Sequence, residues 1–245
     1  MSDFKIHVID VQNKLQNYIW LIEHVATRQV VVIDPTQADL VQKFCEDHQL
    51  TIVQIWLTHW HKDHVEGVPA LQRDFPQTTI YGPEAESAKI PFMTHPLRHD
   101  DHFNFHNLDI EIISVPGHTL GHIIFYIDTI QSVFVGDTLF ALGCGRVSEG
   151  TYAQMFHSVN RIAALPSPTK IYCAHEYTLS NAKFALHVEP DNLTLIERAK
   201  HIEDLRLLNK ITLPTTVELE LATNPFLRVE TIQEFEHLRK LKDNF

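Results

Sequence analysis

The sequence predicts an α/β body of about 170 residues that is followed by a helical tail of about 70 residues. Short runs of β-branched and aromatic residues alternate with segments of helical spacing up to about residue 175. Beyond about residue 177 the apolar residues keep a helical spacing. Side chains of the kinds that bind metals follow several of the apolar runs, which indicates a functional site in the body.

The first part of the body is predicted to contain four strands. Residues 4–10, 18–23 and 29–33 are short β-branched or aromatic runs with breaks between them. A helix should follow the third run, because Leu40, Val41 and Phe44 fall at helical spacing. The run 51–57 is almost wholly apolar, as expected for a strand covered on both faces. A helix from about residue 65 to 73 is expected next.

The second part of the body repeats the pattern. Strands are predicted over residues 108–115, 123–128, 132–135 and 170–173, with a helix over 152–165 before the last of them. The tail consists of helical stretches, and Pro190 interrupts the first. We place the domain boundary between residues 174 and 175.

Composition limits the class of protein. A chain of 245 residues allows one large domain, or one domain with a small appendage. The formal net charge of −11 argues against a general nucleic-acid binder, which needs a basic face. No apolar run reaches the roughly 18 residues of a membrane span, and the N-terminus does not resemble a secretory signal. We therefore expect neither a nucleic-acid nor a membrane partner.

The cysteines indicate a reducing compartment. Cys45, Cys144 and Cys173 are odd in number and widely spaced, so they predict no disulfide framework. A cytoplasmic location is the expectation that follows. Histidine is the unusual residue of this composition, with 17 in the chain.

The stretch LTHWHKDHVEG concentrates potential metal ligands directly after the apolar run 51–57. His59 and His61 alternate, so an extended backbone aims both the same way, and Asp63 and His64 follow as the chain turns. Imidazole and carboxylate suit zinc, iron or manganese. Four ligands packed this tightly cannot all reach one ion, whereas two neighbouring ions would resolve the crowding. The alternative is a polar turn with exposed histidines.

Three more potential ligands follow later apolar runs. His118 stands in SVPGHTLGH, Asp137 in SVFVGDTLF and His175 in IYCAHEYT. Each residue alone is more often a hydrogen-bonded structural residue than a ligand. Their joint occurrence after strands of one α/β body favours a metal site at one edge of the sheets.

The ordered set THWHKDH, PGHTLGH, GDTLF and HEYT resembles the metallo-β-lactamase superfamily over the first 175 or so residues. The resemblance implies an α+β fold, a four-layer αββα sandwich with two divalent metal ions at one edge. Zinc is favoured, and iron and manganese suit the same ligands. The ligands that it implies are His59, His61 and His118 for one ion, Asp63, His64 and His175 for the other, and Asp137 as a bridge.

The same resemblance implies a chemistry. A hydroxide shared between the ions would be the nucleophile, since metal coordination brings the pKa of water toward neutrality. Asp63 and Asp137 become the candidate catalytic carboxylates.

Three further stretches, FALGCGRVSEGT, CAHEYTLSNAKFALHVEP and LRKLKDNF, together with the helical tail, resemble the glyoxalase II (hydroxyacylglutathione hydrolase) family. The implied reaction is hydrolysis of S-D-lactoylglutathione and related 2-hydroxyacylglutathione thioesters to glutathione and D-lactate, the second step of methylglyoxal detoxification. Residues 1–174 would form the catalytic domain and residues 175–245 a helical substrate-binding domain. We expect a monomer.

Glutathione carries two carboxylates, so an acidic protein needs local cations to hold it. Arg239 and Lys242 are three apart on the last predicted helix, share a face, and match the family's carboxylate-binding pair. We expect them near the surface. Arg146 stands where the family usually has a lysine, and Tyr177 matches a tyrosine of the substrate pocket. The alternatives are a solvated helix face for the cations and ordinary packing for Tyr177. Ser148 replaces a tyrosine of some members and puts one glutathione contact in doubt.

Several polar residues near these motifs receive other interpretations. His122 and Asp34 are assigned structural roles or contacts to ligands, and Trp60 and Lys62 should point away from the ions. The histidine-rich segment 94–106 is expected to form a surface loop and strand, with adventitious metal binding as the alternative.

Rival functions remain within and outside the superfamily. A glutathione persulfide dioxygenase is the strongest, because it shares the fold and glutathione but uses a single iron and lacks the helical domain. A β-lactamase has no use for the tail, and a tRNA-processing nuclease disagrees with the acidic charge. A binding module with a degenerate site is disfavoured by the complete ligand set.

Overall fold

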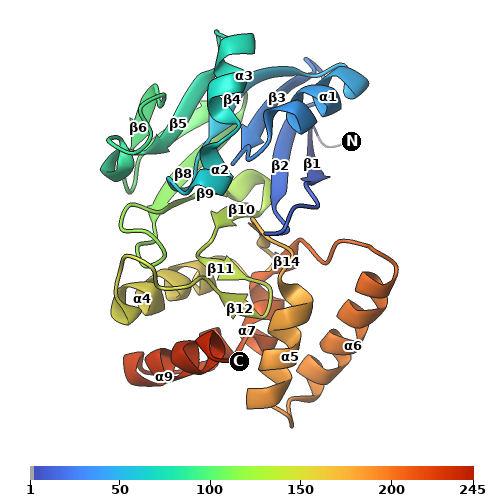
Figure 1. The fold of residues 1–245 in the computed structure, drawn as a ribbon, viewed down its shortest axis with the longest axis vertical. Helices are drawn as coiled ribbons and strands as arrows, with labels where there is room; N and C mark the ends of the chain where they lie inside the picture. Colours follow the sequence, from blue (N-terminus) through green and yellow to red (C-terminus); the bar gives the residue numbers. More distant parts are fainter. Residues whose placement is uncertain (1–2) are drawn as a thin grey trace.

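Two six-stranded sheets form the centre of the protein in a computed structural model that describes residues 3–245 (Figure 1). The first sheet is antiparallel through β1, β2 and β3 and parallel from β3 to β6. Its strands, in spatial order, are β1 (Phe4–Asp10), β2 (Tyr18–His24), β3 (Gln29–Ile33), β4 (Thr51–Trp56), β5 (Thr79–Pro83) and β6 (His95–Leu97).

The second sheet is also mixed. Only β10 and β13 run parallel in it, and the other neighbours are antiparallel. Its strands, in spatial order, are β14 (Thr215–Thr216), β13 (Lys170–Cys173), β10 (Ser132–Gly136), β9 (Ile123–Ile127), β8 (Leu108–Ser114) and β7 (His102–Phe105). A short hairpin of β11 (Leu139–Phe140) and β12 (Gly143–Cys144) follows β10.

The main core lies between the two sheets, and strand β4 shows why. Its neighbours Ile55 and Trp56 are both fully buried but face opposite ways, as alternation in a strand requires. Trp56 enters the core between the sheets, where its ring stacks on that of Phe125 with centroids 5.2 Å apart. Ile55 enters a second cluster beneath the helices of the outer face. The predicted strand with two covered faces is confirmed.

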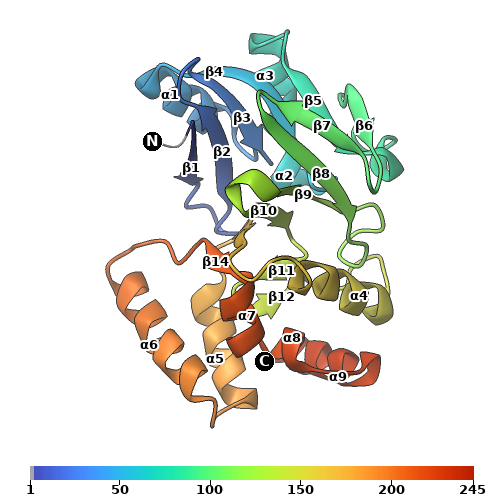
Figure 2. The same ribbon diagram turned by 180° about the vertical axis from the view of Figure 1, so that it is seen from behind.

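Helices complete the four layers. Helices α1 (Ala38–His48) and α3 (Val68–Asp74) cover the first sheet on the face away from the second sheet (Figures 1 and 2). Helix α4 (Tyr152–Ala163) begins with a capping box between Thr151 and Gln154 and packs into the core of the second sheet. The αββα sandwich expected from the sequence is therefore present. Within the described residues, no helix combines the length and apolarity that crossing a bilayer requires.

The tail is helical, as predicted, and shares the core of the body. Strand β14 pairs with β13, and Phe226, Phe235 and Leu238 join the main core. Helices α5 and α6 lie side by side (Figure 2). Together with Leu142 they form a small apolar cluster. The tail helices are α5 (Thr178–Val188), α6 (Leu193–Leu207), α7 (Val217–Thr223), α8 (Pro225–Arg228) and α9 (Ile232–Asp243).

The helix predicted from about residue 65 to 73 is confirmed for residues 68–73 but does not begin where expected. The structure has a short helix α2 (Lys62–Val65) and then α3, with Gly67 between them. The Gly67 N–H donates to the Pro35 carbonyl at 2.9 Å, and a Cβ on Gly67 would stand 2.4 Å from that oxygen. Pro69 then favours a new helical start. Helix α2 thereby carries Asp63 and His64.

Candidate metal centre and substrate pocket

One edge of the two sheets gathers all seven predicted ligands. His59 and His61 follow β4, and α2 adds Asp63 and His64. The loop between β8 and β9 supplies His118, while Asp137 and His175 follow the parallel strands β10 and β13. The residues that follow the strand ends of both sheets therefore meet at one place.

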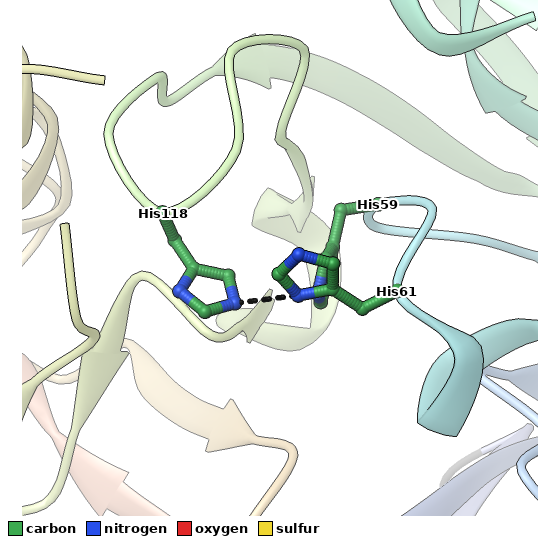
Figure 3. Close-up of side chains that lie close together, drawn as sticks. All are labelled: His59, His61 and His118. Atoms are coloured by element: carbon green, nitrogen blue, oxygen red, sulfur yellow. Dashed lines mark hydrogen bonds between the residues drawn. The ribbon is translucent and has the colours of Figure 1, made fainter. Parts of the chain in front are cut away.

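The first group consists of His59, His61 and His118, whose potential ligand atoms all lie within 4.8 Å of one another. Figure 3 shows the His118 ring reaching from its own loop toward the other two. Its Nε2 lies 2.9 Å from Nδ1 of His61. Three imidazoles that converge in this way are suited to hold one divalent ion.

The second group consists of Asp63, His64 and His175, again within 4.8 Å. Nε2 of His64 lies 3.5 Å from Oδ2 of Asp63, and Nε2 of His175 lies 3.6 Å from the same oxygen. His64 and His175 are almost fully buried, whereas the Asp63 side chain is 26% exposed.

Asp137 lies between the two groups. Its Oδ2 is 3.4 Å from Nε2 of His118, and its Oδ1 is 3.1 Å from Nε2 of His175 and 3.5 Å from Nε2 of His64. Burial alone would raise the pKa of Asp137, but the nearby charges of His175 and His64 outweigh it and hold the pKa well below its usual value. One carboxylate thus faces both groups in its ionised form.

Neighbouring oxygens fix the orientation of the rings. Nδ1 of His64 lies 3.0 Å from Oδ2 of Asp34. Nδ1 of His118 lies 2.9 Å from the Arg146 carbonyl oxygen, and Nδ1 of His175 lies 2.8 Å from the Leu15 carbonyl oxygen. Each contact turns Nε2 of that ring toward the cluster, the arrangement that metal-binding histidines favour. The expected contact from Asp34 to a ligand is confirmed.

The residues at this point fit divalent metal ions. His59 Nε2, His64 Nε2 and Asp137 Oδ1 are buried and have no hydrogen-bond partner in the described part of the chain. A buried polar atom left without a partner costs roughly 1–3 kcal/mol, so three at one point indicate a missing electrophile. Nitrogen and carboxylate donors are what zinc, iron and manganese accept. Among residues 3–245, no histidine of the segment 94–106 belongs to a comparable group.

Two nearby residues have structural contacts. His122 stacks on His59 with ring centroids 4.6 Å apart, and its Nε2 accepts from the Asp137 N–H at 3.2 Å, in line with the structural role expected for it. Asn17 was not predicted. Its Nδ2 donates to Oδ2 of Asp63 at 3.1 Å. A lone asparagine before a strand carries no sequence pattern that would have revealed this contact.

A pocket of about 650 Å³ opens beside the cluster and is bordered by His118 and Asp137. All four predicted substrate-binding residues line it, and so does Ser148. The four residues are Arg146, Tyr177, Arg239 and Lys242. The structure thus joins the metal-type cluster to a cavity that carries four cationic side chains, because Lys183 also lines it.

The cations differ in exposure. The Arg146 side chain is 77% exposed, whereas Arg239 is buried, contrary to the expected position near the surface. Arg239 donates to the Cys144 carbonyl and pairs with Asp243 at 3.1 Å, and its Nε is unpartnered. Burial and the charge of Arg239 lower the pKa of Lys242 to about 8.

Tyr177 and Cys144 also line the pocket. The Tyr177 ring stacks on His175 with centroids 4.8 Å apart, and burial raises the pKa of Tyr177, so the phenol stays a protonated donor. Burial also raises the pKa of Cys144 to about 11. Cys144 is therefore a poor thiolate nucleophile.

The two parts of the chain match two models of known protein families. Residues 13–175 match the model of the metallo-beta-lactamase superfamily, and residues 176–245 match that of the hydroxyacylglutathione hydrolase C-terminus. Proteins from Brucella ovis and Brucella abortus named hydroxyacylglutathione hydrolase are each 48% identical over 212 residues, which cover 86% of this chain and 82% of theirs.

Solved structures agree on the fold. ETHE1 from Myxococcus xanthus has a TM-score of 0.72 at 24% identity, with 96% of this chain and 90% of that chain covered. A metallo-beta-lactamase from Staphylococcus aureus has a TM-score of 0.72 at 19% identity, with 99% and 72% covered. Together with the matched models and the buried histidine–aspartate cluster, these likenesses place the chain in the metallo-β-lactamase superfamily and, within it, in the hydroxyacylglutathione hydrolase family.

Proposed function

We propose that this protein hydrolyses S-D-lactoylglutathione and related 2-hydroxyacylglutathione thioesters to glutathione and the free 2-hydroxy acid. The observation that carries the proposal is the shared cavity, in which a buried histidine–aspartate cluster meets four cations. The names of the Brucella relatives support the same activity.

We infer that the cluster holds two divalent ions, with zinc favoured over iron and manganese. The triad His59, His61 and His118 would hold one, the group Asp63, His64 and His175 the other, and Asp137 would serve both. When bound, such ions lower the pKa of a coordinated water and polarise the carbonyl under attack.

Side chains of the cavity would bind the substrate and transfer the proton. Lys242, Arg239 and Arg146 line the side of the cavity where the glutathione carboxylates would bind, and Tyr177 offers a phenol hydrogen bond. Asp63 is the more exposed carboxylate of the cluster and would take up the proton of the attacking water, while Asp137 stays ionised. Because the Cys144 thiol has a raised pKa, the reaction should pass through no acyl-enzyme.

Three substrates test the assignment. S-D-lactoylglutathione should be hydrolysed readily, and the same acyl group on N-acetylcysteamine at least about tenfold less efficiently, because it lacks the carboxylates that charge-assisted hydrogen bonds would hold. Glutathione persulfide should cause no oxygen uptake. Oxygen uptake with the persulfide and no thioester hydrolysis would favour the dioxygenase alternative instead.

Other expectations stay predictions. These are the division into catalytic residues 1–174 and substrate-binding residues 175–245, the monomeric state and the cytoplasmic location.

A further inference from the structure

We propose that Glu149 is a positioning residue that ties together the two chain segments of the first histidine triad. One segment carries His59 and His61, and the other carries His118. The inference rests on the metal centre proposed above and concerns how this chain shapes it.

The carboxylate of Glu149 contacts both segments directly. Its Oε1 accepts from Nε1 of Trp60 at 2.9 Å, and Trp60 is the residue between the two histidines of the first segment. Its Oε2 accepts from the backbone N–H of Leu120 at 3.1 Å, two residues beyond His118. The Glu149 N–H also donates to the His118 carbonyl at 3.3 Å. One side chain therefore joins two segments that are distant in sequence.

Lys89 reinforces this contact from a third segment. Its Nζ donates to Oε1 of Glu149 at 2.9 Å and lies 4.1 Å from the ring centroid of Trp60. The cation therefore pairs with the carboxylate and covers the indole face at the same time. The Glu149 side chain is only 22% exposed, so these contacts are partly shielded from solvent.

A second carboxylate holds the loop of His118 on its other side. Glu86, at the end of the 3₁₀ turn Glu84–Glu86, is almost fully buried. Its Oε1 accepts from the hydroxyl of Thr119 and from the N–H of Gly121 at 3.1 Å. With Leu120 held by Glu149, each of the three residues after His118 has a carboxylate partner. The loop is thus anchored by side chains as well as by its own backbone.

The second group of ligands has different supports. His64 is oriented by Asp34, His175 by the Leu15 carbonyl, and Asp63 by Asn17. None of these contacts involves Glu149. Loss of the Glu149 carboxylate should therefore weaken one ion and spare the other, which a general loss of stability would not do.

Competition titration of the full-length protein with Zn²⁺ against a chromophoric chelator gives a dissociation constant for each ion. Glu149→Gln should weaken one of the two by about tenfold or more, the range for the loss of contacts that orient ligands, and leave the other unchanged. Glu66→Gln is the matched control. It removes the same charge two residues from His64, but within residues 3–245 Glu66 pairs only with the exposed Lys62, so both constants should stay at the wild-type values.

Trp60→Phe provides a milder second variant, because it removes the indole donor and keeps an aromatic ring. It should weaken the binding of the same ion. In the double variant the loss of affinity should be smaller than the sum of the two single losses, since both changes remove the same contact. Glu149→Gln with two wild-type constants, or with both ions weakened equally, would overturn the inference. A wild-type protein that binds fewer than two ions would overturn the proposed centre and the inference with it.

Discussion

Asp137 is the residue on which both ligand groups converge. Its two oxygens lie 3.1 Å from His175 and 3.4 Å from His118, so no other single side chain of the cluster can replace it. Losing a neighbour that only orients a ligand costs roughly 10–100-fold in metal affinity or activity. We expect Asp137→Ala to exceed that loss in turnover and to retain fewer ions in elemental analysis. A variant with full metal content and more than a tenth of wild-type turnover would contradict the bridging role.

Lys242 gives the pocket a pH dependence. Its pKa is lowered to about 8, so the side chain is charged below that pH and neutral above it. Because kcat/KM reports the free enzyme, kcat/KM for lactoylglutathione should fall as the pH rises through about 8. Well above pH 8, kcat/KM should level off at a value about tenfold lower than at low pH. The reason is that a charge-assisted hydrogen bond of roughly 1.5–3 kcal/mol is lost and solvent screens part of it.

Lys242→Arg is the control for this profile. Arginine keeps its charge throughout the range, so the decline above pH 8 should disappear. Lys242→Gln should be low at every pH through a raised KM, with kcat little changed. An unaltered decline in either variant would assign the titration to another group.

At the residue scale, side-chain type was the informative part of the sequence. The clustering of the seven candidate ligands could be predicted because imidazoles and carboxylates followed apolar strands in order. Their hydrogen-bond partners could not be, because the carbonyls of Leu15 and Arg146 are backbone atoms that every residue has. The burial of Arg239 was missed for a related reason. Its partner is the Cys144 carbonyl, 95 residues away.

Helix α7 contributes a buried ion pair that supports the hairpin β11–β12. Glu220 is fully buried, pairs with Arg198, and accepts from the Leu142 N–H at 2.9 Å. Removing one partner of a buried pair costs roughly 3–5 kcal/mol. Glu220→Gln should therefore lower the free energy of unfolding in urea by about 3 kcal/mol.

The hairpin also borders the substrate pocket through Phe140 and Cys144, so the same variant should raise KM. Glu218→Gln, two residues earlier on α7 and exposed, should leave both quantities nearly unchanged. Equal stability of the two variants would show that the buried pair does not hold the hairpin.

At the element scale, apolar runs were predicted well even where they are short, as over residues 170–173, whereas β5 and β6 were not among the predicted strands. Strands β5 and β6 have five and three residues, and the parallel pairing of β5 with β4 and of β6 with β5 gives them order that local sequence does not express. The start of the helix expected over residues 65–73 was misplaced because Gly67 approaches the Pro35 carbonyl, a contact between distant segments.

The whole molecule is acidic, with a formal net charge of −11, yet four cationic side chains line its pocket. Raising the salt concentration should raise KM for lactoylglutathione, because screening lengths shrink from about 10 Å at 0.1 M to about 3 Å at 1 M. In the double variant Arg146→Ala/Lys242→Ala, KM should rise less with salt than it does in the wild-type protein. Equal salt dependence in both proteins would place the glutathione carboxylates elsewhere.

At this scale the fold class followed from the resemblance, whereas the placement of the tail required the structure. The sequence indicated helices after about residue 177. It gave no indication that residues 215–216 add a strand to the second sheet or that Phe226 and Phe235 enter its core. Such contacts depend on how distant surfaces fit, which no local pattern encodes.

Reconstitution of the metal-free protein tests the central claim most directly. Zn²⁺ is added in steps, and bound ions and hydrolysis of S-D-lactoylglutathione are measured on the same samples. Activity should keep rising until two ions are bound per chain, because each ligand group supplies a separate site around Asp137. Full hydrolysis with a single bound ion, or two bound ions without hydrolysis, would contradict the account.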